Sequence, residues 1–171
     1  MERTIEIRAP TDPFGPEGTR WLAVLISNYG CDPNEYWNIQ VAPGCQATTA
    51  IPPQCLWGPD SKMGSILLLD LTNVTPPLDD VTPYVLRYFT PSQITYYGLC
   101  PGNNAYVMVF HVVDSTPGDY TANAIALAMQ TSDAQGNLIW RALIWSYVDP
   151  PIQKYGAEPL SLTIRLVFPL T

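Results

Sequence analysis

The chain contains one histidine, His111, and this limits the chemistry available to it. A zinc enzyme brings several histidine, cysteine or carboxylate ligands to one ion, and the metal-binding branch of the cupin jelly rolls needs more than one histidine. We therefore predict no metal site. His111 lies in the middle of an apolar run, beside Val109, Val112 and Val113. We expect a structural histidine, buried and neutral, with a ring nitrogen bonded to the backbone. The alternative is a nucleophile–base role.

The remaining reactive groups form no recognisable catalytic set. The sequence lacks a Gly-x-Ser-x-Gly elbow and has no thiol in a recognisable setting beside the histidine. Its eleven glycines occur singly, without the spacing of a phosphate-binding loop. Asp70 and Asp114 lie near expected strand ends, so a glycosidase-like carboxylate pair is the alternative that the sequence leaves open. We predict that the protein is not an enzyme and has no catalytic residues and no cofactor.

The four cysteines are Cys31, Cys45, Cys55 and Cys100, and none of them form a Cys-x-x-Cys pair. This spacing does not favour a zinc ribbon or a redox site. All four lie within two residues of a glycine or proline in loop-like stretches, which favours loop-stapling disulfides over buried thiols if the final environment is oxidising. Three pairings remain open. Such bonds would form after lysis, on a particle surface, or in the cytosol of a thermophile.

Composition indicates a folded chain rather than a disordered one. Among 171 residues, 18 are proline and only 13% are charged, yet 47% are hydrophobic and 11% aromatic. A chain of this length and apolar content can bury a core. We predict a single domain spanning residues 1–171.

The net charge of −7 excludes several classes of partner. No two Lys or Arg residues are adjacent, and binding to DNA, RNA or anionic lipid requires clustered positive charge. The N-terminal residues mix charges and lack the apolar stretch of a signal peptide, and no apolar run approaches the ~18 residues that span a bilayer. We expect a soluble protein that is not exported by the Sec pathway.

Short runs of β-branched and aromatic residues between prolines and glycines predict strands. The expected strands are distributed along the whole chain, and no helix is expected. Tyr120–Thr131 is rich in helix formers, but Ile125, Leu127 and Met129 alternate with alanines, a period of two that predicts a strand. A turn at residues 132–137 would then return the chain as a hairpin. The strands are predicted at 4–8, 20–28, 36–42, 65–73, 83–90, 104–114, 120–131, 138–148 and 160–168.

This pattern predicts an all-β fold, an antiparallel β-sandwich wound as a single jelly roll of about eight strands. The run 104–114 has large side chains on both faces, so we expect an inner strand whose two faces are both covered. Two proline-rich segments connect strands: an extended arm at residues 9–18 and a long loop at residues 43–59. We predict that these segments and the C-terminal stretch 160–171 contact neighbouring molecules, aided by the low charge.

The tryptophans allow a second interpretation. Trp21, Trp140 and Trp145 lie within predicted strands, where they are expected to pack in the core. Trp37 and Trp57 flank the cysteine loops and, with Tyr36, would suit the sugar platform of a carbohydrate-binding β-sandwich. Aromatic residues outside a core more often mark protein–protein contacts. A carbohydrate-binding module therefore remains the alternative function.

Taken together, the acidic sandwich pattern, the long proline-rich loops and the missing catalytic set resemble the single jelly-roll capsid proteins of viruses. More narrowly, the chain is similar to the smaller of two major capsid proteins of tailless icosahedral phages that have an internal membrane and infect thermophilic bacteria. The resemblance covers most of the chain and rests on its pattern, without a diagnostic short motif.

This resemblance implies a structural protein of an icosahedral capsid shell, synthesised in the host cytoplasm and located in the virion. It implies assembly with itself, as a dimer or larger, and with a second capsid protein, near an internal viral membrane. Direct nucleic-acid binding is not expected. The few N-terminal arginines, Arg3, Arg8 and Arg20, are diluted by acidic residues, as suits a shell that a membrane separates from the genome.

Overall fold

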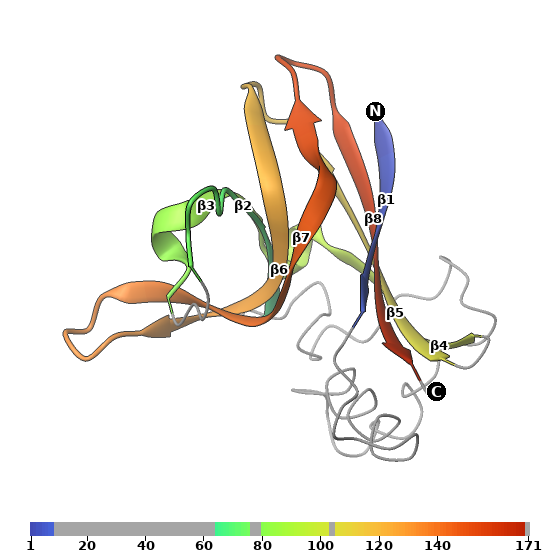
Figure 1. Cartoon of the computed structure of the whole chain (residues 1–171), viewed down its shortest axis with the longest axis horizontal. Coiled ribbons are helices and arrows are strands. Elements are labelled where there is room, and N and C mark those ends of the chain that lie inside the picture. Colours follow the sequence, from blue (N-terminus) through green and yellow to red (C-terminus); the bar gives the residue numbers. More distant parts are fainter. Residues whose placement is uncertain (9–63, 76–79, 103–104, 170–171) are drawn as a thin grey trace.

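The computed structural model describes residues 1–8, 64–75, 80–102 and 105–169, drawn in colour in Figure 1. The predicted strands at 20–28 and 36–42, the arm at 9–18 and the loop at 43–59 lie outside these residues. So do Cys31, Cys45 and Cys55. For Cys100 the structure describes the backbone alone.

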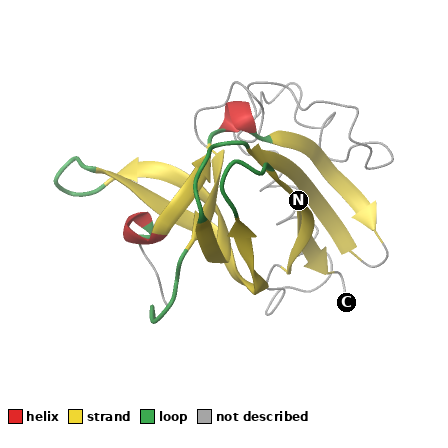
Figure 2. Cartoon of the chain, turned by 90° about the horizontal axis from the view of Figure 1, so that it is seen from above, coloured by secondary structure: helices red, strands yellow, loops and turns green. Residues whose placement is uncertain are grey.

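Two four-stranded sheets form the described part of the chain (Figures 1 and 2). Sheet A has the strand order β1-β8-β5-β4, and sheet B has the order β3-β2-β6-β7. The all-β sandwich predicted from the sequence is confirmed. Sheet A contains β1 (Glu2–Arg8), β4 (Thr95–Gly102), β5 (Ala105–Asp114) and β8 (Leu160–Pro169); sheet B contains β2 (Gly64–Leu69), β3 (Val85–Phe89), β6 (Tyr120–Ser132) and β7 (Leu138–Lys154).

All seven strands predicted within the described residues have observed counterparts, with shifted ends. The strand predicted at 65–73 ends at Leu69, because the Asp70 carboxylate accepts hydrogen bonds from the backbone N–H and the hydroxyl of Thr72 and forms a turn. Strand β4 was not predicted, since Gly98 and the Pro101-Gly102 pair are typical of turns. Two short 3-10 turns, Thr82–Tyr84 and Pro91–Gln93, flank β3.

Strand directions in the two described sheets are mainly antiparallel. Neighbouring strands are antiparallel except β1 and β8, which run parallel, whereas a jelly roll is built from antiparallel strands. No hairpin joins β1 to β8, so nothing local fixes their relative direction. Three connections, from β2 to β3, β4 to β5 and β6 to β7, also remain within one sheet. The predicted antiparallel β-sandwich is therefore confirmed in the described residues, with β1 and β8 as its one parallel pair.

The main core lies between the two sheets. Alternate residues of β8 enter it, and β8 pairs on one side with β1 and on the other with β5. Leu160–Pro169 is an inner strand of the fold, so its edges are already paired, and the predicted contact of the stretch 160–171 with neighbouring molecules stays a prediction. The prediction of an inner strand at 104–114 is confirmed, although Val113 on its outer face is exposed. The β8 residues in the core are Leu160, Leu162, Ile164, Leu166 and Phe168.

A second apolar cluster lies on the other face of sheet B. It contains Leu67 and Leu69 of β2, three alanines of β6 (124, 126 and 128), and Trp140 of β7. Beyond Met129, strand β6 no longer pairs with β2 and continues with β7 as a two-stranded arm, which Figure 1 shows projecting to one side. Small side chains at Ala124, Ala126 and Ala128 allow large neighbours to pack closely over this face. The alanine alternation of the sequence thus reflects a strand that is buried on both faces.

Replacing Ala126 with leucine should lower the free energy of unfolding by about 2 kcal/mol, because a fully buried site would be overpacked. Ala126 lies opposite Leu67 on one side and Trp145 on the other, so neither neighbour can move without disturbing its strand. Urea unfolding measures the effect. Thr121→Leu is the control, since Thr121 is exposed on the same strand and should change stability by less than about 0.5 kcal/mol. Equal effects for the two variants would contradict a second core.

Candidate functional site

His111 lies on the outer face of sheet A and is half-buried. Its Nε2 atom is 2.7 Å from the hydroxyl of Ser161 on β8. The expected backbone partner is wrong, because β5 and β8 are both inner strands and their backbone groups bond to neighbouring strands. A side-chain hydroxyl on the adjacent strand satisfies the ring instead.

A shallow polar groove with a volume of about 340 Å³ surrounds this pair. A hydroxyl bonded to an imidazole is one half of a nucleophile–base arrangement. Acyl transfer also needs N–H donors aimed at a developing oxyanion, and the backbone N–H groups of β5 and β8 are engaged in the sheet ladder. We therefore interpret Ser161 as the hydrogen-bonding partner of a structural histidine. Its lining residues are Glu2, Arg3, Thr4, His111, Ser161 and Thr163.

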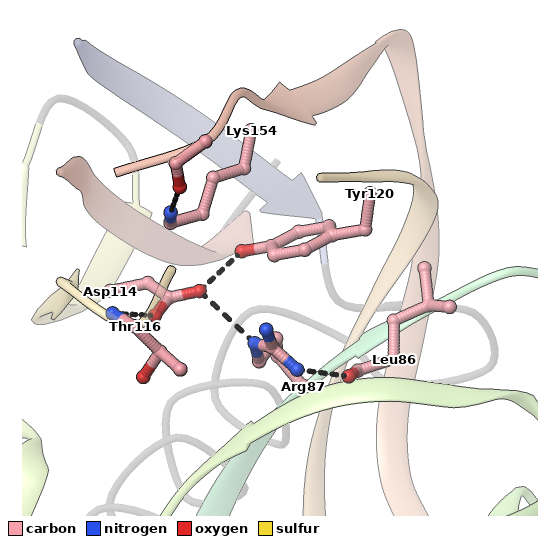
Figure 3. Close-up of polar contacts among 7 residues, drawn as sticks. Leu86, Arg87, Asp114, Thr116, Tyr120 and Lys154 are labelled. Atoms are coloured by element: carbon pink, nitrogen blue, oxygen red, sulfur yellow. Dashed lines mark hydrogen bonds and ion pairs between the residues drawn. The ribbon is translucent and has the colours of Figure 1, made fainter. Parts of the chain in front are cut away.

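Asp114 is the centre of a buried polar network that joins the two sheets (Figure 3). Its side chain is 3% exposed at the end of β5 in sheet A. One carboxylate oxygen accepts a hydrogen bond from the Tyr120 hydroxyl of β6 at 2.8 Å and lies 3.5 Å from Nε of Arg87 on β3. The other accepts a hydrogen bond from the backbone N–H of Thr116 at 2.9 Å. Asp114 therefore fixes sheet A against two strands of sheet B.

Tyr120 and Arg87 also contact each other. The guanidinium carbon of Arg87 lies 5.4 Å from the centre of the Tyr120 ring, within the range of a cation–π interaction. Burial, followed by the hydrogen bond to Asp114, raises the pKa of the Tyr120 hydroxyl far above its ordinary value. Tyr120 thus stays protonated and donates its hydrogen bond throughout the physiological pH range.

Lys154, at the end of β7, lies opposite Tyr120 in the sheet and is 2% exposed. Its ammonium group donates a hydrogen bond of 2.8 Å to the carbonyl oxygen of Gly156 (Figure 3). Sequence reasoning missed Arg87, Tyr120 and Lys154. The available signal was a charged residue inside an apolar strand, as at Arg87 in PYVLRYFT, since such residues are rarely buried without a partner.

The two aspartates singled out from the sequence have separate partners. Asp70 is exposed, and the hydrogen bonds from the side chain and backbone of Thr72 lower the pKa of its carboxyl group. Asp114 is held by Arg87, Tyr120 and Thr116. The structure gives the two carboxylates no shared contact, so their arrangement favours two structural roles over a glycosidase pair.

The two described tryptophans lie on the outer face of sheet B. Trp140 is 8% exposed, with its ring 5.5 Å from that of Tyr88, which confirms its expected core position. Trp145 is half-buried beside the apolar cluster and meets the ring of Tyr147 edge-on at 5.2 Å. Leu67 and Ala126 lie between Tyr88 and Trp145 in one cross-strand row and are fully buried. This face is therefore filled rather than open. Trp21 and the sugar platform predicted at Tyr36, Trp37 and Trp57 lie outside the described residues.

Strand β7 carries an exposed apolar surface. It is an edge strand of sheet B, and within the described residues β6 is the one strand that pairs with it. Leu138 is 65% exposed, Leu143 49% and Tyr147 52%. A long edge strand with exposed apolar side chains is a natural site for pairing with another chain. We call this feature the β7 surface, defined by Leu138, Leu143 and Tyr147.

Two other kinds of feature are missing from the described ranges. Those residues include no helix long and apolar enough to cross a membrane. They also include no group of three or more His, Cys, Asp or Glu side chains placed to hold a metal ion.

Comparison with known proteins found no matching family model, no matching curated protein and no matching solved structure.

Proposed function

We propose that this chain is a structural protein of an icosahedral virus capsid shell, assembling with itself and with a second capsid protein. The observation that carries the proposal is the β7 surface. Three apolar side chains, each about half exposed or more, lie on one edge strand of an otherwise well-packed sandwich. An edge strand with exposed apolar side chains offers a site for contact between proteins.

The rest of the sandwich is suited to a building block. One core fills the space between the sheets, a second covers the outer face of sheet B, and the Asp114 network ties the sheets together. The described titratable side chains that sequence analysis singled out bond to neighbours within the fold. These features support a rigid scaffold that presents surfaces for contact.

The outer face of β1, at one edge of sheet A, has the opposite character. The side chains of β1 that point away from the core are Glu2, Thr4, Glu6 and Arg8, and all of them are exposed. Hydroxyl and charged residues on this face favour contact with water, whereas the β7 surface favours contact with protein. This polarity suits a shell protein that has different neighbours on its different sides.

The proposal is tested by sedimenting virus particles from a culture that produces this chain. The protein should co-sediment with intact particles on a density gradient, resist a high-salt wash, and be released when the shell is disrupted. An abundant host protein of similar mass serves as the control and should stay at the top of the gradient. A chain that remains with the host proteins would contradict the proposal.

A further inference from the structure

Strand β1, blue in Figure 1, is the last strand on one side of sheet A. Its pairing with β8 runs from Glu2 to Arg8 without a bulge, so β1 is a regular strand along this whole length. Among the described residues, no other strand pairs with it. An unpaired strand edge is a template for a strand of another chain. We call the side of residues 2–8 that faces away from β8 the β1 edge.

The backbone groups on the β1 edge belong to alternate residues. The carbonyl oxygen of Met1 accepts a hydrogen bond of 2.8 Å from the N–H of Ser161, so it points toward β8. Successive residues of a strand direct their N–H and C=O groups to opposite edges. The groups that reach the β1 edge are therefore those of Glu2, Thr4, Glu6 and Arg8.

The side chains of these four residues form a pattern that is complementary to itself. All four are exposed on the outer face of β1. Two such strands that run antiparallel about Ile5 place Glu2 opposite Arg8, and they place Thr4 opposite Glu6. The Nε atom of Arg8 already lies 3.4 Å from a carboxylate oxygen of Glu6 in its own chain. This exposed pair is weak, and a guanidinium has five N–H donors, so Arg8 can also bind Glu2 of a second copy.

From this pattern we infer that two copies of the chain pair β1 to β1, antiparallel, about a two-fold axis at Ile5. The inference rests on the proposed assembly function and names a second copy of the chain as the partner of the β1 edge. Glu2 and Arg8 then form an opposite-charge pair on each side of the axis, which is a favourable cross-strand pair. On the inner face Ile5, a core residue, lies beside Ile5 of the second copy. The outer face of β1 stays in water, because the contact uses the edge of the strand.

Neighbouring registers place like charges together. A shift of one residue would exchange the inner and outer faces, so the alternatives are shifts of two. In one direction Glu2 lies opposite Glu6, twice, and in the other direction Glu6 lies opposite Glu6 of the second copy. Like charges directly opposite each other are destabilising. The charges that discourage other partners at an edge strand thus select this one register. A two-fold contact also closes on itself, so it produces dimers and not open fibres.

The register is tested by disulfide trapping with two variants that each add one cysteine, Thr4→Cys and Glu6→Cys. Both positions are exposed, so the fold should tolerate the substitutions. The two chains carry tags of different length, are produced together and are then oxidised. Facing residues that exchange hydrogen bonds have Cα atoms about 5.5 Å apart, within the range of a disulfide. We expect a cross-linked dimer that joins the T4C chain to the E6C chain.

Each variant alone should give no more cross-linking than the wild-type chain, whose four cysteines set the background. The matched control is Val113→Cys, at an exposed position on the outer face of sheet A, produced together with the E6C chain. Cross-linking of T4C to E6C that is no greater than in this control would overturn the inference. Cross-linking of T4C to itself, or of E6C to itself, would overturn it too, because either product marks a register shifted by two residues.

Charge exchange gives a second measurement. Glu2→Arg should weaken dimerisation about tenfold, because like charges then face each other twice in the symmetric contact. Adding Arg8→Glu should restore it, as analytical ultracentrifugation would show. Failure of the double variant to recover would count against the register. If the chain co-sediments with particles but shows neither result, the inference falls and the proposed function stands; a trapped dimer absent from particles gives the reverse.

Discussion

Replacing Asp114 with alanine is expected to lower the free energy of unfolding by about 3 kcal/mol. The substitution removes the acceptor for Tyr120 and Thr116 and leaves Arg87 without its ion-pair partner. Removing one member of a buried ion pair costs about 3–5 kcal/mol. We place the effect at the lower end of this range, because one third of the Arg87 side chain remains exposed to water. Urea unfolding followed by tryptophan fluorescence measures it.

Two variants separate the network from general effects of removing an aspartate. Asp70→Ala removes an exposed carboxylate with local partners and should cost less than about 0.5 kcal/mol. Tyr120→Phe removes one hydrogen bond to Asp114 and should cost about 1 kcal/mol. If Asp114→Ala were no more destabilising than Asp70→Ala, the network would not be what ties the two sheets together.

The second large effect is expected for Phe110→Ala, which should lower the free energy of unfolding by about 4 kcal/mol. Phe110 is fully buried between the sheets and stacks on Tyr96 of the neighbouring strand β4, with ring centres 4.9 Å apart. Alanine would leave a cavity that the rigid strands on either side cannot close. Val113→Ala on the exposed face of the same strand is the control and should change stability by less than about 0.5 kcal/mol. A loss below about 1.5 kcal/mol for Phe110→Ala would mean that this core is loosely packed.

Sequence patterns predicted those strands whose residues alternate or form compact apolar runs. Strand β6 is the clearest case, because the alternation of alanines with Ile125 and Leu127 excluded a helix and placed the larger residues in the main core. Strand β4 escaped prediction because its glycines and proline are turn formers by local preference, and its pairing with β5 overrides that preference. Strand ends depend on side-chain bonds such as that of Asp70 with Thr72, which pattern alone does not reveal.

The polar network shows where prediction from sequence stops. Asp114 was recognised as a strand-end carboxylate, but its partners Arg87 and Tyr120 are on two strands of the opposite sheet. Which strands face each other follows from the packing of the sheets, and local sequence carries little information about it. The same limit applies to Ser161, which became the partner of His111 only through the pairing of β5 with β8.

The exposure of the β7 surface could not be predicted from the sequence alone. The sequence predicted a strand from Leu138 and a hairpin with the preceding strand, and both are observed. That β7 would be an edge strand, with Leu143 and Tyr147 exposed, depends on the strand order of sheet B. The segments predicted to make contacts at 9–18 and 43–59 lie outside the described residues and stay predictions.

The central claim is that this chain builds a virus shell, and the protein composition of purified particles tests it most directly. Quantitative mass spectrometry of gradient-purified virions should find the chain among their most abundant proteins, in a fixed ratio to a second capsid protein. That ratio should be the same across independent preparations, because shell symmetry fixes the numbers of contacts. A chain that is absent from the particles, or present in trace amounts that vary between preparations, would contradict the account.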